Sequence, residues 1–239
     1  MKKIGLFFLS ALFFLSALIL ITTGCKLDPP IYPDGSDTTN NTGGTVTTPN
    51  NSASGYQPTT KGSTWKYTTT VDATTLVQTT TMTGATLKIN NKLYYAATTT
   101  LDADKGYTYY YHDNDNYTYR SDMVSADLVI EYLYLKDNWD IGKTWTTTIT
   151  DSGLLNGFPA QIIGKIVEKD ITKVVDGKTY TNVIHTHLEL QYNTTGSFVT
   201  YQDIDFYIAK GVGIVYILTK NSVTSTGTNT TTLNSYTIK

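Results

Sequence analysis

The sequence contains very little of several residue types that build binding and catalytic sites. Its 239 residues include one cysteine, Cys25, one arginine, Arg120, and three histidines. A single cysteine excludes a disulfide within the chain and a thiolate metal site, so the fold has to be stabilised by its core alone. A single arginine argues against a clamp for phosphate or carboxylate ligands, because such clamps normally use the bidentate guanidinium group.

Charge is also scarce, and its balance is slightly negative. Charged residues make up 16% of the chain and the formal net charge is −2. Nucleic-acid binding is not expected, because it requires clustered basic residues. A Gly-x-Ser-x-Gly nucleophile elbow, a phosphate-binding Walker loop and a His-Glu-x-x-His zinc helix are all absent from the sequence. We therefore expect a protein that is not an enzyme and carries no cofactor.

The N-terminus has the pattern of a secretory signal. Lys2 and Lys3 precede an unbroken apolar run over residues 4–21, and a charged start followed by an apolar stretch is typical of a signal peptide. A transmembrane anchor is the alternative, since about 18 apolar residues are close to the minimum that spans a bilayer. The residues that follow the run favour the signal peptide.

Those residues are Thr-Thr-Gly-Cys, with the only cysteine directly after the small residues. This resembles the lipobox of bacterial lipoproteins, in which the chain is cut before the cysteine and the thiol is lipidated. Thr22 stands where a strict lipobox has Leu, a departure typical of Bacteroidota-type lipoproteins. The resemblance implies a signal peptide over residues 1–24, lipidation of Cys25, and attachment to the bacterial cell envelope at the outer membrane, facing the periplasm or the surface.

The next segment, residues 25–55, is rich in Thr, Asn, Gly, Ser and Pro. It has almost nothing to bury and so cannot offset the entropy of ordering it, which predicts a disordered tether between the lipid and the folded part. Within it, Asp37-Thr38-Thr39 resembles the O-glycosylation acceptor of Bacteroidota-type bacteria, although a chance match in a Thr-rich tract is an equal explanation.

Residues 56–239 have a β composition and are predicted to form one all-β domain. Thr, Tyr, Val and Ile dominate, and several segments alternate polar and apolar residues with the period of two that marks a half-buried strand. Ile89–Tyr94 and Val175–Tyr180 contain Asn-Asn and Asp-Gly, which favour hairpin turns. The pattern predicts an antiparallel meander that forms a curled sheet, a half-barrel or a sandwich. Met123–Leu135 is expected to form a short helix at most.

The same order of short motifs occurs twice. Gly-x-Thr-Trp appears at Trp65 and again at Trp145, each time followed by Lys-x-Tyr and then Tyr-x-Asp-x-Asp-x-Tyr. Internal similarity of this kind suggests a diverged duplication with halves 56–138 and 139–239 that share one core. The Tyr- and Thr-rich composition is the alternative explanation, since such a chain matches itself easily.

These motifs also carry a family resemblance. Gly62-Ser-Thr-Trp-Lys-Tyr67, Gly142-Lys-Thr-Trp145 and Ala209-Lys-Gly-Val-Gly-Ile-Val215 resemble the Gly-x-x-Trp-x-Tyr, Gly-x-x-Trp and Ala-x-Gly-Val-Gly-x-Val pattern of an uncharacterised family of Bacteroidota-type secreted lipoproteins. The resemblance implies a curled antiparallel sheet like that of periplasmic lipoprotein carriers, an open half-barrel with an apolar lining.

The strongest candidate for a metal site is His185-Thr-His187-Leu-Glu189. On a strand the two imidazoles and the carboxylate project from one face about 7 Å apart in succession, and these groups could bind zinc or another transition metal. The alternative is the polar, solvent-facing side of a half-buried strand. No further histidine lies nearby in the sequence to complete a site, because His112 is the only other one.

Carboxylates that could act as a catalytic pair occur at Asp203 and Asp205, two residues apart on a predicted strand. Phe198, Ile204 and Phe206 are expected on the opposite, buried face of that strand. Outward-facing polarity, on the same alternation, is the preferred explanation of the two carboxylates.

Tyrosine is abundant, with 19 residues, and Tyr107, Tyr109 and Tyr111 would line one face of a strand. Exposed, this row would form a flat aromatic platform suited to stacking on sugar rings. Buried, it would pack across strands and keep its hydroxyl groups at the edge of the core.

Taken together, these observations predict a membrane-anchored, non-catalytic lipoprotein that binds an apolar or glycan ligand. A structural or adhesin-like surface protein is one alternative. A metal-dependent or carboxylate-based hydrolase, using the histidines with Glu189 or the aspartate pair, is another.

Overall fold

The computed structural model describes residues 55–71, 74–102, 104–125, 128–222 and 227–239. The predicted signal peptide, the lipidation site Cys25, nearly all of the tether and the Asp37-Thr38-Thr39 motif lie outside these residues and stay predictions. The described part contains no helix, and hence none long and apolar enough to cross a membrane.

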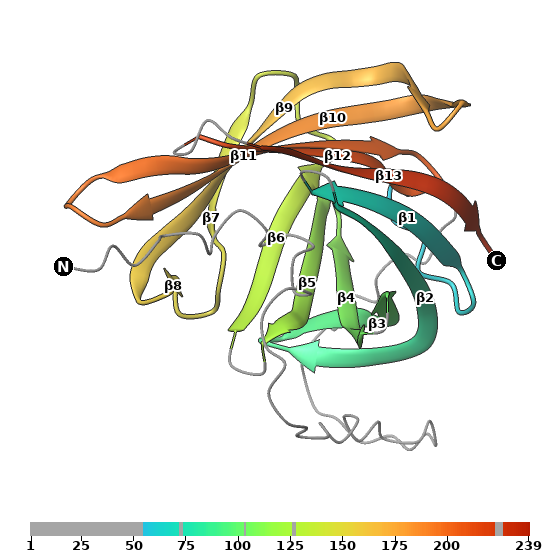
Figure 1. Cartoon of the computed structure of the whole chain (residues 1–239), viewed down its shortest axis with the longest axis horizontal. Coiled ribbons are helices and arrows are strands. Elements are labelled where there is room, and N and C mark those ends of the chain that lie inside the picture. The colour runs from blue at the N-terminus through green and yellow to red at the C-terminus, as the bar shows by residue number, and fades with distance from the viewer. Residues whose placement is uncertain (1–54, 72–73, 103, 126–127, 223–226) are drawn as a thin grey trace.

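All regular elements of the described residues are β-strands, as predicted (Figure 1). Their bounds are β1 (Thr64–Val71), β2 (Thr74–Ile89), β3 (Lys92–Leu101), β4 (Asp104–Asp113), β5 (Asn116–Ser125), β6 (Leu128–Lys136), β7 (Thr144–Thr148), β8 (Leu154–Leu155), β9 (Phe158–Val175), β10 (Lys178–Asn193), β11 (Phe198–Ala209), β12 (Gly213–Asn221) and β13 (Thr228–Thr237).

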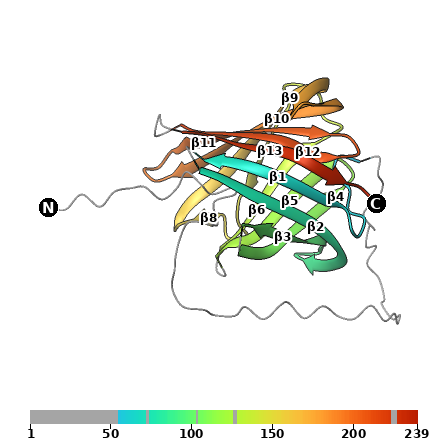
Figure 2. The same cartoon turned by 45° about the vertical axis from the view of Figure 1, so that its right-hand side comes forward.

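The strands form one antiparallel sheet in the order β6-β5-β4-β3-β2-β1-β13-β12-β11-β10-β9-β7, while the short β8 pairs with the start of β9. The predicted curled antiparallel sheet is confirmed, and the curl closes further than a half-barrel (Figure 2). Each predicted half supplies six strands of the main order, β1–β6 and β7 with β9–β13. The division into halves at 56–138 and 139–239 and their origin by duplication both stay predictions.

Both predicted hairpin turns are present. Asn90 and Asn91 have φ angles of 48° and 63°, and Asp176 and Gly177 have φ angles of 49° and 72°. These positive values suit the primed turns that match the twist of the flanking strands.

The expectation of a short helix within Met123–Leu135 is wrong, because this segment belongs to β5 and β6. Ile130, Tyr132 and Tyr134 recur with a period of two and are at most 2% exposed. Their β-branched and aromatic side chains pack well on a pleated surface and favour strand over helix.

The two edges of the sheet, β6 and β7, close the barrel without a regular ladder. Glu131 N donates to Ile149 O at 2.8 Å. Two side chains also donate to the β6 backbone across this seam: Trp145 Nε1 donates to Leu133 O at 3.1 Å, and Thr186 Oγ1 donates to Tyr134 O at 2.8 Å. Thr186 lies on the inner face of β10, so β6 packs against the inner face of the sheet near the edge formed by β7.

A buried charge network reinforces this seam from the outer face. Arg120 on β5, whose side chain is 8% exposed, bonds Glu131 on β6 at 3.1 Å and Asp151 in the segment after β7 at 2.8 Å. Tyr94 Oη and Lys92 Nζ, from the β2–β3 hairpin, reach Glu131 at 2.5 and 3.0 Å. Burial raises the pKa of Glu131, but the bonds from Tyr94, Lys92 and Arg120 outweigh it and leave the pKa below its usual value. The only arginine is therefore used to hold strands together.

The inside of the barrel is packed with the chain's own side chains. Tyr110, Tyr119 and Tyr132 lie in register across β4, β5 and β6 and are buried. Trp65 and Phe206, also fully buried, belong to the same cluster. Buried aromatic side chains contribute much of the stability of such a core, since each removes a large apolar area from water.

Candidate ligand-binding site

The predicted alternation of β10 is confirmed at its centre. Ile184, Leu188 and Leu190 are buried in the core, while the odd-numbered residues between them face outward. In register with these lie the outward side chains of β11, with His187 opposite Asp205 and Glu189 opposite Asp203. The outer face of β9, β10 and β11 therefore carries a continuous strip of polar side chains.

One end of this strip is a histidine–carboxylate cluster, formed by Glu168, His185, His187, Asp203 and Asp205. Asp205 Oδ1 lies 2.9 Å from His185 Nε2 and 3.0 Å from His187 Nδ1. His185 Nδ1 lies 3.0 Å from Glu168 Oε2, and His187 Nε2 lies 3.4 Å from Asp203 Oδ1. All four imidazole nitrogens thus face carboxylate oxygens.

The cluster is partly covered from solvent. The Tyr207 ring stacks on His185 at 4.3 Å between centroids, and Lys173 Nζ lies 3.7 Å from the centroid of the Tyr207 ring. His185 is only 9% exposed. Burial raises the pKa of Asp205, but the hydrogen bonds with His185 and His187 lower it more, so the carboxyl group stays ionised well below its usual pKa.

This geometry gives the cluster a pH dependence. The hydrogen bond with Asp205 is the largest cause of a raised pKa for His187; desolvation opposes it, and the charges of Asp205, Asp203 and Glu189 add to it. The folded protein therefore favours the imidazolium form. Its contribution to stability is full below about pH 6.5, the ordinary pKa of imidazole, and is lost as the pH rises through the folded pKa.

We expect the free energy of unfolding to fall as the pH rises above about 6.5, and a series of urea denaturation curves across this range measures it. Asp205 has a depressed pKa, so its contribution to the free energy of unfolding is lost only on the acid side. The loss begins as the pH falls below about 3.9, toward the folded pKa. His187→Gln removes the imidazole and should flatten the fall on the alkaline side. An unchanged slope in that variant would contradict the assignment to His187.

The predicted metal set is not brought together as a group. Glu189 accepts hydrogen bonds from Gln191 Nε2 and Thr200 Oγ1, both at 2.9 Å, while His185 and His187 face Asp205. Among the described residues, no group of three or more His, Cys, Asp or Glu side chains is arranged to hold a metal ion. Metal binding by the three residues stays a prediction without support from this geometry.

Glu189 instead ends a chain of hydrogen bonds that leads to a pocket. Gln191 Nε2 donates to Glu189, and Gln191 Oε1 accepts from Gln161 Nε2 at 2.9 Å. The second donation of Gln191, to Thr200 Oγ1 at 3.2 Å, fixes the same amide. This chain orients Gln161, which lies on the wall of the pocket.

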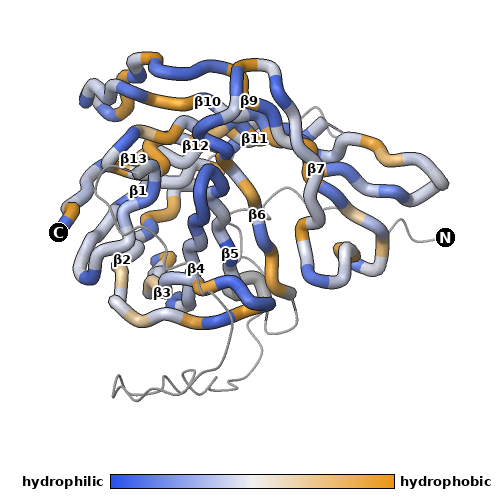
Figure 3. Tube along the Cα trace, turned by 180° about the vertical axis from the view of Figure 1, so that it is seen from behind, coloured by the Kyte–Doolittle hydropathy of each residue, from blue (hydrophilic) through white to orange (hydrophobic). Residues whose placement is uncertain are grey.

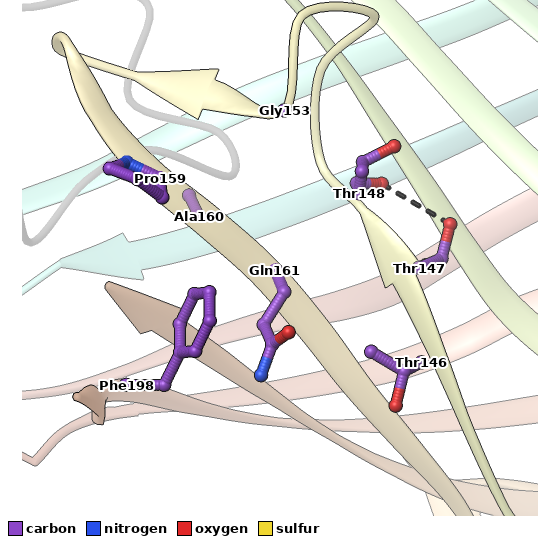
Figure 4. A pocket seen from close by; sticks show the side chains of 8 residues that line it. All are labelled: Thr146, Thr147, Thr148, Gly153, Pro159, Ala160, Gln161 and Phe198. Carbon is purple, nitrogen blue, oxygen red and sulfur yellow. Dashed lines mark hydrogen bonds between the residues drawn. The ribbon is translucent and has the colours of Figure 1, made fainter. Parts of the chain in front are cut away.

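The pocket is open and has a volume of about 380 Å³ (Figure 4). Its walls come from β7, β9 and the first residue of β11, together with the turn before β8, and its lining residues are Thr146, Thr147, Thr148, Gly153, Pro159, Ala160, Gln161 and Phe198. The Phe198 ring is 41% exposed and stands beside the Gln161 amide, and Thr146 lies across from both (Figure 4). An exposed aromatic ring therefore adjoins amide and hydroxyl groups.

The position of Phe198 corrects the sequence-based expectation that it lies on the buried face with Ile204 and Phe206. A bulge in β11 causes the difference. Gln191 pairs with Thr200, but its neighbour Leu190 pairs with Gln202, so one residue of β11 is extra. An extra residue reverses the alternation of side chains along a strand. Phe198 therefore leaves the core side and reaches the pocket.

The predicted tyrosine row is packed instead of fully open. Tyr109 is 5% exposed, and Tyr107 and Tyr111 are half-buried against a small second cluster around Tyr94 and Ala96. Tyr94 and Tyr111 lie 5.3 Å apart between ring centroids. The structure thus shows the cross-strand packing that was the alternative to a sugar-stacking platform, and a ligand-binding role of the row stays a prediction.

The residues of the hydrolase alternative lie together on the outer face of β10 and β11, away from the pocket beside Phe198. Asp203 and Asp205 are both held by imidazoles on the outer face, and Ser222 Oγ also donates to Asp203. None of the cluster's residues lines the pocket at Phe198.

Comparison with known proteins gives similarities of fold at low sequence identity. No family model and no curated protein matches the chain. A solved Bacteroides fragilis structure, described as an exported protein with a YmcC-like fold, has a TM-score of 0.49 and 13% identity, covering 75% of this chain and 97% of that one. A Parabacteroides distasonis structure, described as a lipoprotein, has a TM-score of 0.48 and 10% identity, covering 77% and 99%. At these values neither similarity assigns a family or a function.

Proposed function

We propose that the chain is a lipid-anchored protein of the bacterial cell envelope that binds a glycan, without converting it, in the open pocket beside Phe198. The observation that carries the proposal is the exposed Phe198 ring next to the oriented Gln161 amide. Sugar rings present C–H faces that stack on aromatic rings and hydroxyl groups that bond to amides, so the two groups complement one ligand class.

The anchor rests on the N-terminal sequence, where the apolar run ends in Thr-Thr-Gly-Cys25. A glycan is favoured over an apolar ligand, because the core of the barrel is packed with buried side chains such as Trp65, Tyr134 and Phe206. The pocket lies outside that core, is open to solvent and has hydroxyl and amide groups in its wall. Open, partly polar sites suit hydrated ligands better than lipids.

Phe198→Ala is expected to weaken glycan binding about tenfold, which corresponds to about 1.4 kcal/mol. The substitution removes the stacking surface at a residue that is 41% exposed and not part of the hydrophobic core cluster. A glycan array with the full mature chain identifies a ligand, and calorimetric titration then compares the variants. Gln161→Ala should also weaken binding, since it removes the oriented amide.

The matched control is Phe158→Ala. Phe158 is 46% exposed on the neighbouring β8–β9 hairpin and does not line the pocket, so its removal should leave the dissociation constant unchanged. Equal losses in Phe158→Ala and Phe198→Ala would show that the pocket is not the site. Absence of glycan binding by the unmodified chain would favour the structural or adhesin-like alternative.

A further inference from the structure

Two neighbouring hairpins carry exposed apolar side chains at the same end of the barrel. Leu154 and Phe158, on the β8–β9 hairpin, are 44% and 46% exposed, and Val199, at the start of β11, is 56% exposed. We call these three residues the apolar tips. Both hairpins lie on the left in Figure 1 and, seen from behind, on the right in Figure 3, where each includes hydrophobic segments.

The apolar tips are surrounded by uncharged sequence. Residues 152–164 and 190–202 contain no Asp, Glu, Lys or Arg. The nearest charge before the first stretch, Asp151, is paired with Arg120. A surface that has to stay in water usually places charges beside exposed apolar groups, so their absence from both hairpins marks a surface that fits a less polar partner.

The opposite end of the barrel has a different character. The turn from β9 to β10 has Asp176 and Lys178, and the segment from β6 to β7 has Lys136, Asp140 and Lys143. Single apolar residues are exposed there as well, such as Val174 at 64%, but charged residues stand next to them. Among these described segments, the β8–β9 and β10–β11 hairpins therefore combine exposed apolar side chains with uncharged neighbouring sequence, and the two segments at the opposite end do not.

From these observations we propose that the apolar tips insert into the interface of the lipid bilayer that holds the anchor. Side chains such as Leu, Phe and Val bury their apolar groups at the boundary between headgroups and acyl chains, and the Asn, Ser, Thr and Gly residues of the same hairpins remain at headgroup level. The inference rests on the proposed lipid anchor but not on the proposed glycan.

The length of the tether permits this orientation. The chain enters the barrel at the end opposite the tips, where Gly211 N donates to Gly55 O at 2.7 Å. The residues from Cys25 to Ser54 number 30 (54 − 25 + 1) and can span up to about 100 Å at full extension. The 16 residues of β10 extend about 50 Å. An anchored chain can thus pass along the barrel and still let the far end touch the membrane.

The only native cysteine makes the test direct. Because Cys25 is expected to carry the lipid, a second cysteine introduced at Leu154→Cys or Val199→Cys provides one free thiol for an environment-sensitive NBD probe. Val174→Cys is the matched control, since it is equally apolar, at least as exposed and at the other end of the barrel. The full lipidated chain, with its lipid confirmed by intact mass, is placed in vesicles of phosphatidylethanolamine with a minor share of phosphatidylglycerol.

Lipids with a nitroxide on the upper acyl chain should quench the probes at positions 154 and 199 several-fold more than the probe at 174. Equal quenching at all three positions, or none at 154 and 199, overturns the proposal. A blue-shifted tip probe that lipid nitroxides do not quench assigns the tips to a second copy of the chain and also overturns it. If Cys25 carries no lipid, the anchor on which the inference rests is absent, and the inference is overturned. The glycan titrations are independent of every one of these outcomes.

Discussion

Arg120→Met is expected to lower the free energy of unfolding by about 3 kcal/mol, the lower end of the range for breaking a buried ion pair. The change removes the cation that holds Glu131 and Asp151 but keeps a side chain of similar length. Glu131, 21% exposed at its side chain, would then keep a largely buried carboxylate with Lys92 as its remaining ion-pair partner. Asp151, at 55% exposed, contributes less because water screens it.

For a folded part of this size, such a loss lowers the melting temperature by about 6–12 °C, which thermal unfolding followed by circular dichroism can measure. Lys143→Met is the control, because the Lys143–Asp140 pair is exposed on both sides and should contribute less than about 0.5 kcal/mol. Adding Glu131→Gln to Arg120→Met should recover part of the stability, since the unpaired charge is removed. Equal effects of Arg120→Met and Lys143→Met would refute a special role of the network at the seam.

Gly164→Ala is expected to destabilise the protein by about 3 kcal/mol, at the upper end for overpacking a core. A Cβ atom at Gly164 would lie 2.1 Å from Cε2 of the Trp145 ring, which packs directly on this glycine from the paired strand β7. The ring has little freedom to move, because its Nε1 donates to Leu133 O across the seam. The added methyl group therefore has to push β7 away from β9 or break the bond to β6.

A double-mutant cycle isolates this contact. Trp145→Leu should also be destabilising, but in its presence the further cost of Gly164→Ala should shrink, because the ring that met the methyl group is gone. The free energies come from urea denaturation of the single and double variants. Strict additivity would mean that the methyl group acts through something other than the Trp145 ring.

The sequence was sufficient for features that depend on neighbouring residues. Alternation predicted the buried and outward faces of β10, and the Asn-Asn and Asp-Gly pairs predicted two turns, because side-chain direction and positive φ angles are local properties. The packing of Tyr107, Tyr109 and Tyr111 was one of two alternatives that alternation could not separate. It depends on what covers that face of β4.

Features that depend on distant segments were missed. Phe198 was placed in the core, because the sequence of its own strand does not indicate the bulge that turns its side chain to the other face. The bulge can be identified only from the pairing of β10 with β11. Gln161 was not identified, since its orientation comes from Gln191 on the next strand. The role of Arg120 at the seam required the positions of Glu131 and Asp151, which lie 11 and 31 residues away.

The pairing of β1 with β13 has a consequence for the order of the chain. Thr64 pairs with Thr237, and Lys239 N donates to Ser63 Oγ at 3.2 Å, so the start and end of the folded part are neighbours. Apart from β8, every other pair of adjacent strands is consecutive along the chain. In connectivity, the protein is therefore a circular permutation of a plain up-and-down meander that would run from β7 to β6. The two ends of the folded part fall in the middle of the sheet, and the β1–β13 pairing is the step of assembly that has to close the longest loop.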